Sequence, residues 1–488
     1  MHADLSRDTF RADRHYSMVL AQQGRVELDA DLNEQAAIQN SRLRAFVADL
    51  IGPDGGLGPD AGFEITPVPG ENGAPDDLTI GEGRYYVDGV AIDATRPVPG
   101  VPVPDDGPPP EPEEPEPWSY FTQPDGFRDP ERPDDRLPGA FPYLVYLKVW
   151  ERAVTAAEDP TLREVALGPS MPDTAARVKV VWQVLALTQA ELGLEGTPEP
   201  DAIREALPHW AGRDDEPRMA ARARRPEDAA DGPGLTRPDA RFRGPENQLY
   251  RVEIHEGGPA AEATLKWSRE NGSVTFGVDT VDGTWVGLTG LGEDDQLRLS
   301  VGEWVELVDT AYTSRLEALP LLRVEEVDVI GRRVRLSGEP DPSVGRRPEL
   351  HPYLRRWDQA GDAPGARGGA LALEEGRWLP LEDGVEVYFA AGDFAYSTGD
   401  YWQVPARTVT GDVDWPRDAG RRPLLAAPAG IAAAYAPLAW ITGPGERTDL
   451  RLIFDPLAAA ASAPAENRTT KKAATAKRSR SRRSSGGA

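Results

Sequence analysis

Apolar residues near the start of the chain recur at the spacing of one helix face. They run from Leu28 to Ile51, and acidic residues stand at the beginning of the segment, where negative charge suits the helix dipole. The pattern predicts an amphipathic helix that Asp29 or Asp31 caps and Gly52-Pro53 ends. Residues 1–27 indicate an extended arm. A lone helix with one apolar stripe requires a partner, either the rest of its own chain or a neighbouring subunit.

Beyond the helix, the apolar pattern changes to the alternation that is typical of strands. Gly81–Ile92 predicts a hairpin that turns at Asp88-Gly89. Tyr143–Trp150 and Val178–Leu187 are apolar on both faces, which predicts strands inside a sheet. Further strand signals recur about every ten residues, with Gly, Asp and Pro between them. We therefore expect a mainly β fold of several β-sandwich or barrel modules, with an N-terminal arm and helix and a disordered basic C-terminal tail.

The same signals divide the chain into segments. Residues 97–117 contain ten prolines among acids, which predicts an extended spacer. From Arg468 onward the chain consists of Lys, Arg, Ser, Thr, Ala and Gly, a composition that cannot form a core. The expected segments are an attachment arm and helix (1–52), a β domain that includes the spacer (53–188), a polar insertion (189–240), two further β domains (241–350 and 351–460) and the disordered basic tail (461–488).

Charge restricts the partners of the protein. The 488 residues include 54 Lys and Arg against 81 Asp and Glu, a formal charge of −27. Eight of the basic residues lie in 467–488, which holds no acid, so the other 466 residues carry −35. Such an acidic body repels nucleic acids and anionic membranes. The tail leaves three interpretations open: a solubilising end, a tether to an acidic partner, or a tail that coats nucleic acid.

Motif content argues against an enzyme. Cysteine is absent, which excludes disulfides, thiolate nucleophiles and zinc ribbons, and the chain has five His. It contains no nucleophile elbow, Walker loop, dinucleotide-binding glycine pattern or His-Glu-x-x-His motif. We expect no catalytic residue, cofactor or metal, although 81 acids leave a glycosidase pair open. A signal peptide and a run of 18 apolar residues are both lacking, so we expect synthesis in the cytoplasm and no membrane insertion.

Rings, guanidinium groups and amides gather at three predicted turns. Such groups either hold a turn in shape by bonding several carbonyl oxygens, or recognise a ligand such as a surface glycan. We favour the structural interpretation and keep ligand binding as the alternative. The residues are Trp267, Arg269 and Asn271 around an Asn-Gly turn, Trp357 after two arginines, and Tyr401, Trp402 and Arg407 after Gly399-Asp400.

Several segments together resemble a bacterial and archaeal family of unassigned function. Its members open with such an arm and a QQGRVQLDADWNEQ segment, which corresponds to residues 22–35 here, with Leu32 in place of Trp. The resemblance spans about residues 5–442, and its other segments are Glu246–His255, Lys266–Ser273, Arg355–Asp358 and Gly399–Trp402.

The family is similar, more remotely, to the N-terminal regions of phage tail-fibre proteins, and its members tend to occur beside genes for contractile, phage-tail-like injection particles. This resemblance implies a structural component of such a particle, which is either cytoplasmic or released. The expected role is that of a baseplate- or tail-fibre-attachment protein that acts as scaffold or adhesin base. We expect it to contact other particle subunits and to form a homo-oligomer such as a trimer. The alternatives are a cargo or effector in the tube lumen and a carbohydrate-active enzyme. Attachment or oligomerisation is expected to involve Phe10, Tyr16, Arg25, Leu28, Leu32, Asn33 and Glu34.

Overall fold

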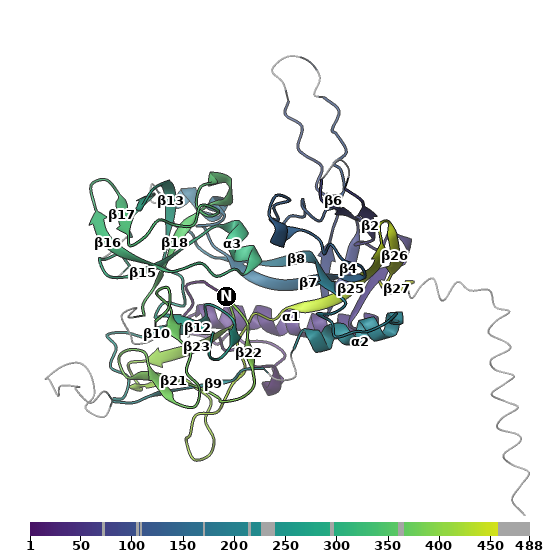
Figure 1. Cartoon of the computed structure of the whole chain (residues 1–488). Coiled ribbons are helices and arrows are strands. Elements are labelled where there is room, and N and C mark those ends of the chain that lie inside the picture. Colours follow the sequence, from purple (N-terminus) through teal and green to yellow (C-terminus); the bar gives the residue numbers. More distant parts are fainter. Residues whose placement is uncertain are drawn as a thin grey trace, which may run out of the picture.

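Strands dominate the chain, which confirms the expected mainly β fold (Figure 1). The computed structural model describes residues 1–456 apart from 71–73, 104–106, 108–109, 169–170, 213–215, 226–239, 293–296 and 360–365. The expected basic tail (461–488) and parts of the expected spacer and insertion lie outside the described residues. Within these limits, no helix combines the length and the hydrophobicity that a membrane span requires.

Helix α1 (Asp29–Ile51) follows the arm, as the apolar spacing predicts. The predicted aspartate cap is wrong, because Leu28 occupies the N-cap position and no side chain bonds the helix end there. The Asp29 carboxylate instead accepts two bonds from Ser6 of the arm, one from its backbone N–H (2.9 Å) and one from its hydroxyl (2.6 Å). A contact with a residue 23 positions earlier therefore replaces the local cap.

One face of α1 packs on the body and the other does not. The helix buries Ala30 and Ile38. Its Arg44 lies against the hairpin of β4 (Arg84–Val87) and β5 (Val90–Asp93), where a Cβ on Gly89 would come within 2.3 Å of the Arg44 carbonyl oxygen. The hairpin turns at Asp88-Gly89 with positive φ at both residues, as predicted. The close approach explains why glycine stands at this turn.

The first module combines strands from both ends of the described chain. They are β1 (Asp54–Leu57), β2 (Ile65–Val68), β3 (Asp77–Ile80), β6 (Trp118–Ser119), β7 (Tyr143–Val154), β8 (Arg177–Thr188), β25 (Ala434–Gly443), β26 (Glu446–Asp449) and β27 (Ile453–Phe454), with β4 and β5. The sheets have the orders β26-β25-β7-β8, β27-β1-β4-β5 and β2-β3-β6. Strand β7 lies inside its sheet, as predicted. The same prediction is wrong for β8, which is an edge strand. Strand β8 is apolar on both faces because a separate hydrophobic cluster covers each face. Helix α2 (Pro200–Trp210) packs against β25.

The second module is a closed six-stranded barrel with antiparallel neighbours. Its strands are β13 (Thr275–Asp282), β14 (Trp285–Leu288), β15 (Trp304–Val308), β16 (Leu322–Asp328), β17 (Arg333–Leu336) and β18 (Tyr353–Trp357), in the order β13-β14-β17-β16-β15-β18. Alternate residues such as Val286, Val305 and Val324 fill the interior. Helix α3 (Thr310–Arg315) follows β15, and the Asp309 side chain caps it. Strand β18 belongs to the segment expected as a separate module, yet it closes this barrel.

The third module encloses a core between two main sheets. The strands are β9 (Met219–Ala223), β10 (Gln248–Ile254), β11 (Gly258–Pro259), β12 (Thr264–Ser268), β19 (Leu371–Ala372), β20 (Trp378–Pro380), β21 (Val385–Phe389), β22 (Ala395–Tyr396), β23 (Tyr401–Arg407) and β24 (Asp412–Val413). One sheet has the order β19-β12-β10-β23-β24, the other β20-β21-β9, and β11 pairs with β22. Phe389 and Trp402 meet edge to face in the core between them.

The three modules meet around the start of the chain. In Figure 1 the N-terminus lies near the centre, between the first module on the right, the barrel at the upper left and the third module at the lower left. The arm therefore begins at the junction and runs outward to α1. Short 3-10 turns connect the larger elements: η1 (Ala12–Arg14), η2 (Gly58–Asp60), η3 (Pro133–Asp135), η4 (Pro160–Leu162), η5 (Val165–Leu167) and η6 (Pro348–Leu350).

Candidate functional site

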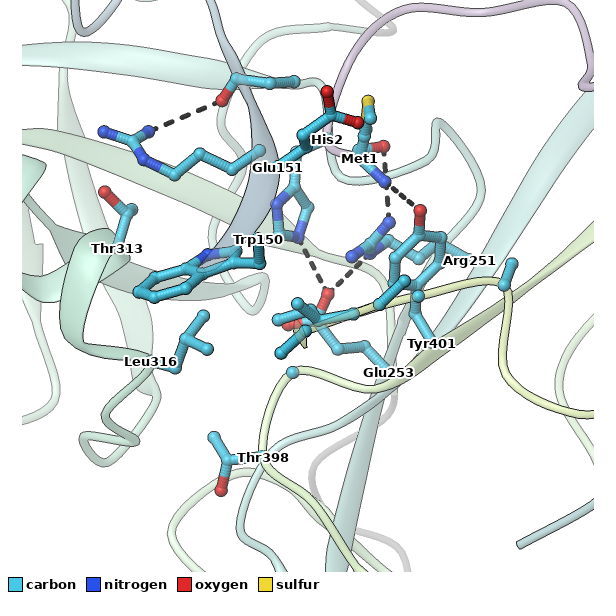
Figure 2. A pocket seen from close by; sticks show the side chains of 18 of the residues that line it. Met1, His2, Trp150, Glu151, Arg251, Glu253, Thr313, Leu316, Thr398 and Tyr401 are labelled. Atoms are coloured by element: carbon cyan, nitrogen blue, oxygen red, sulfur yellow. Dashed lines mark hydrogen bonds and ion pairs between the residues drawn. The ribbon is translucent and has the colours of Figure 1, made fainter. Parts of the chain in front are cut away.

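A cavity of about 240 Å³ lies where the three modules meet. Trp150 of β7 and Leu316, just after α3, lie on one side of it, while Glu253 of β10 and Tyr401 of β23 lie on the other (Figure 2). The loop 429–434 supplies an apolar wall of Ala, Gly and Ile. Each module thus contributes to the lining, so the cavity exists only when all three have docked.

The register of β10 places opposite charges side by side. Arg251 and Glu253 are two residues apart and therefore share one face of the strand, and the Arg251 Nε–H donates to Glu253 Oε2 at 2.5 Å. Glu253 stands opposite Lys266 of β12 and opposite Tyr401 of β23. Lys266 Nζ lies 3.3 Å from Glu253 Oε1, and His2 Nε2 of the arm lies 2.8 Å from Glu253 Oε2. Glu253 is thus enclosed by donors from three segments.

A second carboxylate extends this cluster into the barrel. Glu306 of β15 accepts bonds from Lys266 Nζ (2.7 Å) and from the Tyr312 hydroxyl (2.8 Å), both at Oε1. Its other oxygen accepts from Trp357 Nε1 at 3.0 Å. Because Lys266 contacts both Glu253 and Glu306, it links the third module to the barrel.

The local electrostatics keep both glutamates ionised and both imidazoles neutral. Burial alone would raise the pKa of Glu253, but Arg251, Lys266 and the hydrogen bond with His2 together outweigh burial, and the pKa lies well below the ordinary value. Lys266 likewise lowers the pKa of the buried Glu306. Burial lowers the pKa of His255 to about 4 and that of His2 well below its ordinary value. The cluster therefore carries fixed charges at neutral pH.

The body holds the first residues of the arm beside this cluster. Asn271 Nδ2 donates to the carbonyl oxygens of Met1 (3.0 Å) and Ala3 (2.8 Å), and its Oδ1 accepts from Gln403 (2.9 Å). The Met1 nitrogen donates to the Tyr401 hydroxyl (Figure 2). These contacts, together with those of His2, hold the arm at three consecutive residues.

Further contacts extend this grip along the arm. Arg407 donates to the Ser6 carbonyl oxygen at 2.9 Å. The Thr9 hydroxyl donates to Glu34 of α1 at 2.5 Å, and the Val19 N–H donates to the Gln35 side chain at 2.7 Å. The arm therefore bridges the third module and α1.

The predicted turn residues fall into two groups. Asn271, Tyr401 and Arg407 contact the arm, and Trp357 bonds Glu306 in the charge cluster. The rest lie elsewhere: Trp267 is buried in the core of the third module, Trp402 donates to the Ala426 carbonyl oxygen (3.0 Å), and Arg269 pairs with Glu382 (2.8 Å).

The structure places most predicted attachment residues at the surface. Tyr16, Arg25, Leu28, Leu32 and Asn33 are exposed, whereas Phe10 and Glu34 are half-buried and Glu34 accepts the bond from Thr9. The exposed apolar residues continue along α1 beyond the predicted set, at Leu43, Phe46 and Leu50.

Sequence reasoning missed the charged residues that surround the cavity. Glu253, Lys266 and Glu306 were not singled out, although each interrupts an otherwise apolar strand pattern. A charge at an inward position of a strand was the available signal, because a charge is rarely fully buried unless it is paired. Among the described residues, no group of three or more His, Asp or Glu is placed to hold a metal ion.

The fold and the site define a multi-module β protein whose arm is clamped at the module junction. The chain belongs to a family of unknown function (DUF6519), whose model matches residues 1–205 and 199–447. Comparison with curated proteins and with solved structures gave no match. The family assignment supports the expectation of an uncharacterised domain and carries no activity with it.

Proposed function

We propose that this protein is a structural, non-enzymatic attachment component of a contractile, phage-tail-like particle, in which α1 joins copies of the chain and the β body serves as a rigid base. The resemblance described above supports the particle. The assembly role rests on one observation, an apolar stripe that α1 leaves exposed. Exposed apolar surface of this extent is typical of a contact with another protein.

The stripe has the spacing of a coiled-coil seam. Successive members are four, three, four, three and four residues apart, which is the alternation of a and d positions. Its large side chains are well exposed: Leu32 by 67%, Leu43 and Phe46 by 60% each and Leu50 by 58%. The complete stripe is Leu32, Ala36, Gln39, Leu43, Phe46 and Leu50.

This spacing favours a second copy of the chain as the partner. A seam with this repeat packs side chain into hole against a seam with the same repeat. Gln39 is the polar position in the middle, where side-chain amides of adjacent copies bond one another and fix the register. Full burial of a large apolar side chain contributes about 1.5–3 kcal/mol, so the four large residues of each helix can offset the cost of association.

The test is the oligomeric state of the full-length chain. Sedimentation velocity over a range of concentrations is expected to show a dimer or trimer. The double variant Leu43→Asp and Phe46→Asp should be monomeric, because it places two charges in the seam. The matched control is Val329→Asp with Ile330→Asp, which alters two exposed apolar residues on the barrel (58% and 98% exposed) and should leave the assembly unchanged.

A monomeric wild-type chain at every concentration, or an oligomer that the seam variant does not disturb, would refute self-association through α1. The particle role has its own test. Purified particles should retain the wild-type chain and the barrel control and lack the seam variant. Retention of the seam variant at wild-type levels contradicts α1-mediated attachment.

The two alternatives receive less support. A glycosidase requires a general acid with a raised pKa beside an ionised carboxylate in a cleft. The pKa values of the cavity glutamates Glu253 and Glu306 are lowered, and Glu270, whose pKa is raised to about 7, does not line the cavity. A lumenal cargo has no feature among the described residues that favours it over a base. The copy number of a lumenal cargo per particle should increase with the length of the tube. An attachment base should instead be present in a fixed, small number of copies at one end of the particle.

A further inference from the structure

Several buried polar atoms around the central cavity have no hydrogen-bond partner. They are Trp150 Nε1, Arg152 Nε, His255 Nδ1 and Arg355 Nε, and all four residues line the cavity. Trp150 and His255 are 2% exposed and Arg355 is 6% exposed. Buried polar groups in native proteins are almost always bonded, so a cluster of unbonded ones indicates an unseen partner. Three of the four atoms are N–H donors, which require an acceptor.

Arg355 is the side-chain cation of the lining that has no ion-pair partner among the described residues, although Glu306, Glu253 and Glu158 act on it at longer range. The other side-chain cations of the lining each have a carboxylate: Arg152 pairs with Glu158 (2.6 Å), Lys266 with Glu306 (2.7 Å) and Arg251 with Glu253 (2.5 Å), and Arg44 pairs with Glu151. Within the described residues, Arg355 has no carboxylate at ion-pair distance. Its one side-chain hydrogen bond there is from Nη2 to the Tyr353 hydroxyl, at 2.9 Å.

Glu306 does not form a direct ion pair with Arg355. It stands directly opposite Arg355 in the pairing of β15 with β18. Its oxygens, however, are taken by Lys266, Tyr312 and Trp357. A buried cation without a bonded anion is costly, and water alone would satisfy its N–H groups without balancing its charge.

The remaining walls are apolar. Leu316, Ile431 and Ala433 belong to one apolar cluster with Trp150, and all four residues line the cavity. The volume of about 240 Å³ has room for several waters or for one small organic molecule. An occupant must therefore be small, carry one anionic group and possess an apolar body.

We propose that the cavity binds a small organic carboxylate, whose anionic group bonds Arg355 and whose apolar body packs against Trp150, Leu316 and Ile431. His2 and Met1 form part of the wall, so the ligand also closes the space beneath the arm. Binding and arm docking are thermodynamically linked, because the complete site exists only with the arm in place. The inference is independent of the oligomeric state, and each can fail without the other.

The test uses benzoate and hexanoate as probes on the full-length chain. Calorimetric titration is expected to show saturable binding of the two carboxylates, and tenfold or greater weakening with benzamide and hexanamide, which match them in size without the charge. Saturating benzoate should also slow hydrogen exchange in residues 1–10. No binding by either carboxylate, or equal binding of acid and amide, would overturn the proposal.

Variants locate the site. Arg355→Met should abolish the preference for acid over amide, and Trp150→Phe, which keeps a ring and removes the N–H, should weaken benzoate severalfold. If Arg355→Met does not fold, Trp150→Phe alone still tests whether benzoate binds in this cavity. Arg347→Gln, which removes an exposed guanidinium outside this cavity, serves as the control and should bind benzoate like the wild type. Wild-type affinity in both cavity variants would place the anion elsewhere and refute the assignment.

Discussion

Asn271→Ala tests the clamp on the N-terminal arm. Asn271 is 1% exposed, adopts a left-handed φ of 52°, and bonds the carbonyl oxygens of Met1 and Ala3 as well as the Gln403 side chain. Alanine removes all three hydrogen bonds, about 1 kcal/mol each, and adds roughly 1 kcal/mol because it tolerates the left-handed region less well than asparagine does. We expect a total of about 3–4 kcal/mol.

This cost should appear as release of the arm rather than as global unfolding. Once the arm detaches, its carbonyl oxygens reach water, and the unbonded groups left in the body are few. Hydrogen-exchange mass spectrometry should therefore show faster exchange in residues 1–10, including the Ser6 N–H that bonds Asp29. Asn271→Gly relieves the backbone cost and should release the arm less than alanine does, by about 1 kcal/mol.

Asn40→Ala provides the control, because it makes the same chemical change at an exposed position of α1. Its exchange in residues 1–10 should match that of the wild type. The reasoning is refuted if Asn271→Ala leaves the exchange of residues 1–10 and the unfolding free energy unchanged. Equal effects of the alanine and glycine variants would show that the left-handed backbone contributes nothing.

Two further predictions concern charges near the clamp. Burial raises the pKa of Glu270 to about 7, and the nearby Glu246 and Asp358 add to the increase. Between about pH 4.5 and 7, the folded chain therefore holds a proton on Glu270 that the unfolded chain has lost. The contribution of this proton to the stability of the folded chain falls as pH rises. Glu270→Gln should therefore gain in Tm relative to the wild type between pH 5 and pH 8, and a constant difference would contradict the shift. Lys266→Met leaves Glu253 and Glu306 without their shared cation and should lower the free energy of unfolding, measured in urea, by about 3–5 kcal/mol. A loss below about 1 kcal/mol would contradict this, because it would mean that Arg251 and Tyr312 alone stabilise the two carboxylates.

Local features of the fold were predictable from the sequence. The helix over 29–51 and the Asp88-Gly89 hairpin depend on apolar spacing and on residues that tolerate positive φ, and both are visible within a short window. Strand pairing was not predictable in the same way. One neighbour of β7 is β8, the next strand, but the other is β25, nearly 300 residues later, and alternation within a strand says nothing about which strand lies beside it.

The site shows the same division. The Asn-Gly turn singled out Asn271, but its partners are Met1 and Ala3, some 270 positions away. In the sequence alone, Lys266 is indistinguishable from an exposed residue of a strand. Its burial becomes evident only from its two partners, Glu253 and Glu306. The prediction of an Asp29 cap failed for a related reason, because a tertiary contact with Ser6 competed with the local one.

The pairing of β25 with β7 has a consequence for biosynthesis. About 280 residues separate the end of β7 from the start of β25. At 5–20 residues per second, a ribosome needs roughly 15–60 s to cover that distance. During this interval one edge of β7 has no neighbour, which is the situation in which nascent chains associate wrongly. The order of translation therefore leaves one edge of a 12-residue strand exposed until β25 emerges, and a holding chaperone would have its natural target there.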